Sequence, residues 1–162
     1  MLVGQAITAI LVGKNNTFIN MSADHKNFII QNFAGILHTK CKKITDFKEA
    51  KEIADKLIEV TKVVDGIFKP WLGMAAPQVG YDKRVIILKK SFEKYEVIVN
   101  PEIVEQKFVI PVITRCFSVD GIYIVKSPYW IKVKYQDLQG NYHTEVIKGG
   151  KAATLQQEID HI

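Results

Sequence analysis

The close spacing of short apolar segments in the second half of the chain constrains its fold most strongly. Turn-forming residues separate these segments at Asn100-Pro101, Asp120-Gly121 and Asp137–Asn141. Connections this short join antiparallel strands, because a parallel pair needs a crossover of about a dozen residues or more. The sequence therefore predicts antiparallel strands over residues 83–88, 95–99, 103–112, 122–125, 129–135 and 142–147.

Two helices are expected on either side of this strand-rich region. Residues 46–65 carry an apolar stripe at helical spacing, Asp46 with Glu49 resembles a capping box, and Gly66 is a good stop signal. A second helix is expected from Gly150 onwards. The sequence thus predicts an α+β fold, in which antiparallel strands pack around the C-terminal helix, with one further long helix. The apolar stripe of the long helix needs a sheet or another helix to cover it.

The length of 162 residues is that of one domain with a sizeable core, so we expect a single domain over residues 1–162. Residues 1–34 form an N-terminal extension whose structure the sequence defines least. In this extension, residues 7–13 and 17–20 are typical of a hairpin and residues 23–33 of a short helix. The apolar start of the hairpin lacks a preceding basic segment, which favours a strand over a signal peptide.

Composition excludes few classes of protein. The net charge of +5 is compatible with an anionic partner such as ribosomal RNA, but the lysines are scattered, which favours a mildly basic solvated surface. No run approaches the roughly 18 apolar residues of a membrane span, so a membrane is not an expected partner. DNA is not an expected partner either. Cys41 and Cys116 make no disulfide framework, which favours a reduced cytoplasmic compartment, or an organelle if the source is eukaryotic.

The C-terminal helix carries an incomplete metal-binding motif. Glu158 and His161 are three residues apart and Gln157 is four before His161, so all share one helical face. A His-Glu-x-x-His helix binds a divalent metal through its imidazoles and uses the glutamate as general base. This chain has Gln-Glu-x-x-His, so one imidazole is missing and a chance match stays open.

Two other segments are candidates for a site. Residues 71–80 form a loop of small apolar residues with one polar amide, Gln78, and small residues let a ligand approach the backbone. Cys116 is a candidate nucleophile or ligand, although a buried structural cysteine is the commoner outcome. His38 and Cys41 have ligand spacing, but a buried cysteine beside an exposed histidine is favoured.

Three strings together resemble the peptide deformylases, which are metal hydrolases that remove the formyl group from the initiator methionine of nascent bacterial and organellar chains. These strings are Gly73-Met-Ala-Ala-Pro-Gln-Val-Gly80, Cys116-Phe-Ser118 and Gln156-Gln-Glu-Ile-Asp-His161. The resemblance covers roughly residues 35–162. It implies a divalent metal, most often Fe²⁺ with Zn²⁺, Ni²⁺ or Co²⁺ as substitutes, and a nascent formyl-methionyl peptide as substrate.

The resemblance also implies a role for individual residues. Cys116, His161 and position 157 would hold the metal with a water, and Glu158 would transfer the proton of that water. Gln78 and the backbone amide of Phe117 would bind the oxyanion, and Gly73 would pair with the substrate backbone.

Departures from the family pattern gather around this site. The family has histidine at position 157, Glu-Gly where this chain has Thr114-Arg115, and glycine in place of Trp71. A glutamine carbonyl is neutral and a weaker donor than imidazole, so we expect the metal to be weakly bound or absent. Arg115 either favours the Cys116 thiolate or fills the substrate groove.

Three functions therefore stay open. The first is a deformylase-type hydrolase with weakened activity. The second is a catalytically inactive homologue that keeps the fold and binds a peptide or the ribosome. The third, which explains fewer of the residues, is a thiol enzyme that pairs Cys116 with His161.

Overall fold

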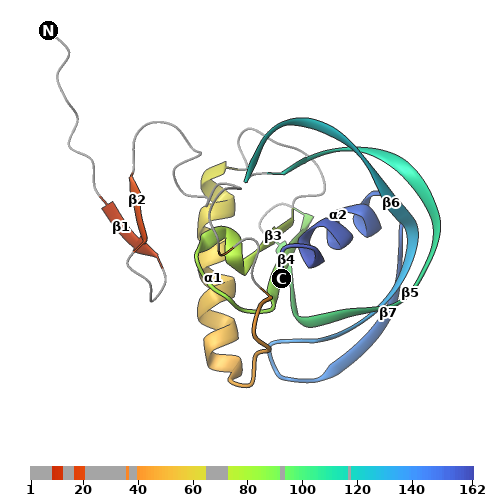
Figure 1. Cartoon of the computed structure of the whole chain (residues 1–162). Coiled ribbons are helices and arrows are strands. Elements are labelled where there is room, and N and C mark those ends of the chain that lie inside the picture. Colours follow the sequence, from red (N-terminus) through yellow and green to blue (C-terminus); the bar gives the residue numbers. More distant parts are fainter. Residues whose placement is uncertain are drawn as a thin grey trace, which may run out of the picture.

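The computed structural model describes residues 9–12, 17–20, 36, 40–64, 73–91, 94–116 and 118–162. Its main feature is a five-stranded antiparallel sheet in the order β3-β4-β5-β6-β7 (Figure 1). With helices α1 (Phe47–Val64) and α2 (Gly150–Ile159), this confirms the predicted α+β fold. Neither of these helices is long and apolar enough to cross a membrane. The strands are β3 (Gly73–Ala75), β4 (Val85–Ser91), β5 (Lys94–Cys116), β6 (Val119–Gln136) and β7 (Tyr142–Lys148).

The sheet separates the two helices, because successive side chains of a strand point to opposite faces. One buried cluster joins α1 to its side of the sheet, and a second joins α2 to the other. Figure 1 shows β5, β6 and β7 curving around α2, so that this helix lies in the hollow of the sheet. In β4, Val85 and Ile87 belong to the α1 cluster, and Ile86 and Leu88 belong to the α2 cluster.

The predicted turn at Asn100-Pro101 is wrong, since β5 continues through it. Asn100 adopts a left-handed conformation with φ of 51°, and the register shifts between Val99 and Glu102. Its side chain accepts from the Ile44 amide at 2.8 Å and donates to the Ile44 carbonyl at 2.9 Å. The asparagine therefore bends the strand into a bulge tied to the preceding segment, and does not reverse the chain.

The predicted turn at Asp120-Gly121 is also wrong, because both residues lie in β6 and the chain reverses between Cys116 and Val119. β6 also joins the two strands expected over 122–125 and 129–135. The turn at Asp137–Asn141 is confirmed, and the Asp137 carboxylate accepts from the Gln139 and Asn141 amides at 2.9 Å each.

The first predicted helix is confirmed, and Asp46 caps it by accepting from the Lys48 amide at 2.9 Å. Glu49 accepts a hydrogen bond from the Lys83 ammonium at 2.9 Å. The N-terminal hairpin is confirmed by β1 (Ala9–Val12) and β2 (Thr17–Asn20), which pair antiparallel. The helix expected over 23–33 and the stop at Gly66 lie outside the described residues.

Candidate active site

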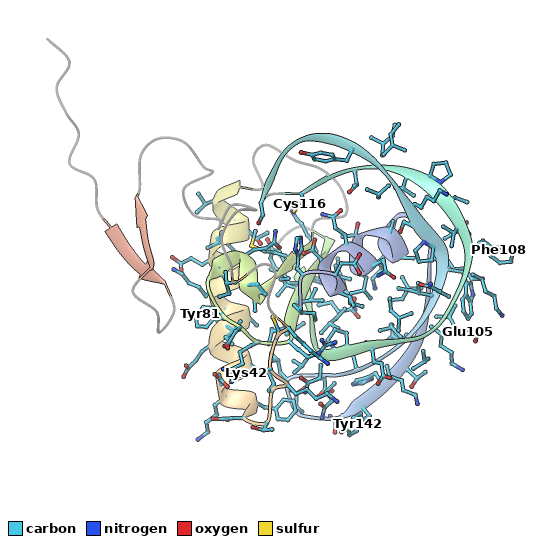
Figure 2. The ribbon with its side chains drawn as sticks, in the orientation of Figure 1. Lys42, Tyr81, Glu105, Phe108, Cys116 and Tyr142 are labelled. Carbon is cyan, nitrogen blue, oxygen red and sulfur yellow. The ribbon has the colours of Figure 1, made fainter. Side chains whose placement is uncertain are left out.

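The candidate site lies between α2, the end of β5 and the segment that follows β3. Cys116 lies at the inner end of β5, near the middle of the molecule, whereas Phe108 and Tyr142 point outward from the rim (Figure 2). The fold therefore brings together residues from all three strings that the sequence singled out.

Cys116 and His161 are in contact, with 3.3 Å between Sγ and Nε2. Tetrahedral zinc bonds of about 2.3 Å to sulfur and about 2.0–2.1 Å to nitrogen place these atoms about 3.5 Å apart. The observed separation is close to this value and also fits a hydrogen bond between the thiol and the imidazole, so the geometry permits both.

His161 lies just beyond the end of α2 at Ile159, in a turn where neighbouring residues hold the backbone. The Cys41 thiol contacts the His161 carbonyl at 3.9 Å, and Arg84 donates to the Ile162 carbonyl at 3.0 Å. Burial, with the nearby Asp82, raises the pKa of Cys41 to about 11, so this side chain stays a thiol that can donate. The end of α2 is therefore held by the segment that precedes α1 and by the residue that precedes β4.

Gln78 is buried and its orientation is fixed. It lies in the short 3₁₀ helix η3 (Ala76–Val79), which ends at Gly80 with φ of 93°. The Ala75 amide donates to Gln78 Oε1 at 2.9 Å, which leaves Nε2 to donate to Ser118 Oγ at 3.2 Å and to contact Cys116 Sγ at 3.8 Å. A preoriented amide donor therefore faces the cysteine.

Glu158 is buried, with 3% of its surface exposed, beside the same cluster. Its Oε2 has no hydrogen-bond partner among the described residues. Burial, with a smaller contribution from Asp160, raises the pKa of the carboxyl to about 8. A bound cation would satisfy an orphaned oxygen of this kind and favour the charged form.

Gly73 lets β3 approach α2 closely. A Cβ atom at this position would lie 2.7 Å from Glu158 Cγ and 2.9 Å from Thr154 Cγ2. Any side chain larger than hydrogen would thus displace the helix or the carboxylate.

Gln157 lies against β5, where the Thr114 hydroxyl donates to its Oε1 at 2.5 Å. Over the described residues, no three His, Cys, Asp or Glu side chains gather into a metal site. A carbonyl oxygen has two lone pairs, so an amide oxygen that accepts a hydrogen bond can also ligate a metal. Cys116, His161 and an amide oxygen fit a divalent metal, with a weaker third donor than imidazole.

Other predicted site residues are not described. Phe117 and Trp71 lie outside the described residues, as does the side chain of Arg115, so their roles stay predictions. Ser118 is a site residue that the sequence does not predict: it is 1% exposed and its hydroxyl accepts a hydrogen bond from Gln78. Its position two residues after the cysteine was the only signal available.

Comparison with known proteins finds matches to the peptide deformylases. The polypeptide deformylase family matches residues 26–162. The chain is 37% identical to a peptide deformylase of Dictyoglomus thermophilum over 129 residues, covering 78% of this chain and 80% of the relative. The peptide deformylase of Thermotoga maritima is 34% identical over 130 residues, with 78% and 76% covered.

Solved structures of peptide deformylases superpose on this chain. The peptide deformylase of Thermus thermophilus superposes with a TM-score of 0.75 at 27% identity, covering 83% of this chain and 78% of that one. A probable peptide deformylase from a Synechococcus phage gives a TM-score of 0.74 at 34% identity, with 82% and 91% covered.

Proposed function

Because the chain belongs to the peptide deformylase family, we propose that it is a metal-dependent hydrolase that removes the formyl group from nascent formyl-methionyl peptides. The observation that carries this proposal is the 3.3 Å contact between Cys116 Sγ and His161 Nε2 beneath the Gln78 amide. In this proposal Gln157 Oε1 is the third protein ligand. The expected compartment is the cytoplasm, where nascent chains and the ribosome are present.

Each site residue has its own role in the proposed hydrolysis. The metal, when bound, lowers the pKa of a water so that hydroxide is available near neutral pH. The buried Glu158 would accept a proton from water and pass it to the leaving amine. Gln78 Nε2, fixed by the Ala75 amide, donates to the developing oxyanion with the Phe117 amide. Gly73 lets β3 lie close to α2, and its backbone would pair with the backbone of the formyl-methionyl substrate.

Weakened activity follows from the donor set. An amide oxygen is neutral and binds Fe²⁺ or Zn²⁺ less well than an imidazole, and structural zinc sites gain about 10–16 kcal/mol from their full ligand sets. Loss of part of this free energy reduces the metal-loaded fraction at a given metal concentration. We therefore expect turnover to require added metal.

A second candidate is an inactive homologue that binds peptides or the ribosome. It is favoured by Gln157, which stands where the resemblance places a ligand histidine and which accepts a hydrogen bond from Thr114. The two functions differ in turnover, so one assay separates them.

The test is formate release from a formyl-Met-Ala peptide by protein loaded without oxygen with Fe²⁺, Co²⁺, Ni²⁺ or Zn²⁺. We expect release that depends on added metal and that Glu158→Gln abolishes without loss of bound metal. Glu52→Gln, which changes an exposed carboxylate on α1, is the matched control and should keep activity. Metal-loaded wild-type protein that releases no formate would reject hydrolysis and leave the second candidate.

A further inference from the structure

Two of the positions that depart from the family pattern contact each other. Thr114 stands where the family has glutamate, and Gln157 stands where it has a ligand histidine. These residues are 43 positions apart in sequence, yet the Thr114 hydroxyl donates to Gln157 Oε1 at 2.5 Å. The departures therefore form one connected pair.

This pair is the neighbour of the Cys116–His161 pair. Thr114 and Cys116 are two residues apart on β5, and the register against β6 shifts between them. Gln157 and His161 are four residues apart along the C-terminal segment, a rise of about 6 Å in helical geometry. One alignment of the end of β5 against the C-terminal segment produces both contacts, so the Thr114–Gln157 contact is the neighbour of the Cys116–His161 contact.

A glutamine needs such support more than a histidine does. Its side chain has one more rotatable bond than that of histidine, so fixing it costs more rotamer entropy. A hydroxyl donor on an ordered strand reduces this cost, because it selects one orientation of the carboxamide before any metal binds. The partners that orient metal ligands are typically worth about 10–100-fold in affinity.

We propose that Thr114 is a positioning residue, which holds the Gln157 carboxamide so that its oxygen completes the metal-ligand set with Cys116 and His161. This inference rests on the proposed function, since it takes Gln157 as a ligand. The substitution at position 114 thus compensates in part for the substitution at position 157.

The experiment measures the dissociation constant of Co²⁺ by the thiolate-to-cobalt charge-transfer absorption, without oxygen. Thr114→Val removes the hydroxyl at constant shape, and we expect it to weaken cobalt binding about 10–100-fold. Thr114→Ser keeps the hydroxyl and should stay within about 3-fold of wild type, well short of that loss. Ile113→Val changes the neighbouring side chain, which is 73% exposed, and is the matched control with unchanged affinity.

A double-mutant cycle separates positioning from a merely structural contact between β5 and α2. In a Gln157→Ala background, Thr114→Val should change the dissociation constant by less than about 3-fold, because the group that it orients is gone. An equal loss in both backgrounds, or equal losses for Thr114→Val and Thr114→Ser, would overturn the inference. Circular dichroism of each variant checks that it is folded.

The experiments distinguish a failure of the proposed hydrolase function from a failure of the positioning role. Cobalt bound by the wild type with the expected Thr114 cycle, but without formate release, would reject hydrolysis and keep the positioning role. Cobalt bound by Gln157→His but not by the wild type would overturn the positioning role, because the carboxamide would then not be a ligand.

Discussion

Gly73→Ala tests the close approach of β3 to α2, on which the position of Glu158 depends. The added Cβ would lie 2.7 Å from Glu158 Cγ and 2.9 Å from Thr154 Cγ2. Ordinary carbon contacts are about 3.5–4.0 Å, so both contacts are short by roughly 0.6–1.3 Å. The Glu158 side chain, the helix, or both must therefore move.

We expect the Gly73→Ala substitution to reduce the catalytic rate much more than the stability. Insertion of a methyl group into a packed site typically costs about 1–3 kcal/mol, which for a chain of this size lowers the melting temperature by about 2–12 °C. A displacement of about 1 Å at a reacting group costs about 100-fold in rate. We therefore expect a modest loss of thermal stability and a loss of about 100-fold in kcat/KM for the formyl-Met peptide.

The assay compares melting curves and formate release for Gly73→Ala and for Gly150→Ala. Gly150 is exposed at the first position of α2, so its substitution is a matched control that should leave both quantities nearly unchanged. Adding Thr154→Ser to Gly73→Ala removes the Cγ2 contact and should recover part of the stability. The reasoning is refuted if Gly73→Ala keeps wild-type stability and activity.

Other predictions concern the metal ligands and the contacts of α2. Gln157→His should strengthen cobalt binding at least about 10-fold in the charge-transfer titration, and unchanged affinity would count against position 157 as a ligand site. Lys151→Met should lower the free energy of unfolding at pH 7 by about 0.5–1 kcal/mol in urea titrations, because Lys151 donates to Glu96 at 2.8 Å. Burial opposes the charge of Glu96, but Lys151 and Lys90 outweigh it and hold the pKa of Glu96 below its ordinary value. The difference between wild type and Lys151→Met should therefore persist above about pH 4.3 and shrink as the pH falls through the lowered pKa, and a constant difference down to about pH 2 would contradict this. Arg84→Met should weaken cobalt binding several-fold, because it releases the backbone next to His161, and equal affinity would show that this anchor is dispensable.

The sequence predicts the features of the fold that depend on local patterns. The apolar stripe of residues 46–65 gives α1, and the Asp137 side chain gives its turn, because both act over a few neighbouring residues. Asn100-Pro101 misleads, since an asparagine in the left-handed conformation serves a bulge as well as a turn. Here its bonds to a distant residue, Ile44, decide between the two.

At the site, too, local patterns are predictable from the sequence and contacts between distant segments are not. Helical spacing alone places Gln157 and His161 near each other, whereas their partners on β5 depend on how that strand aligns with α2. Local patterns do not encode this alignment. The hydrogen bond from Thr114 to Gln157 is therefore not predictable from the sequence, although both residues depart from the family pattern.

The X-ray absorption spectrum of the zinc-loaded protein tests the proposed metal site most directly. We predict close to one zinc per chain, with one sulfur neighbour at about 2.3 Å and nitrogen or oxygen neighbours at about 2.0–2.2 Å. The sulfur signal should vanish in Cys116→Ser, and one light neighbour should be lost in Gln157→Ala. Zinc without a sulfur neighbour, or a spectrum that Gln157→Ala leaves unchanged, would contradict a site formed by Cys116, His161 and Gln157.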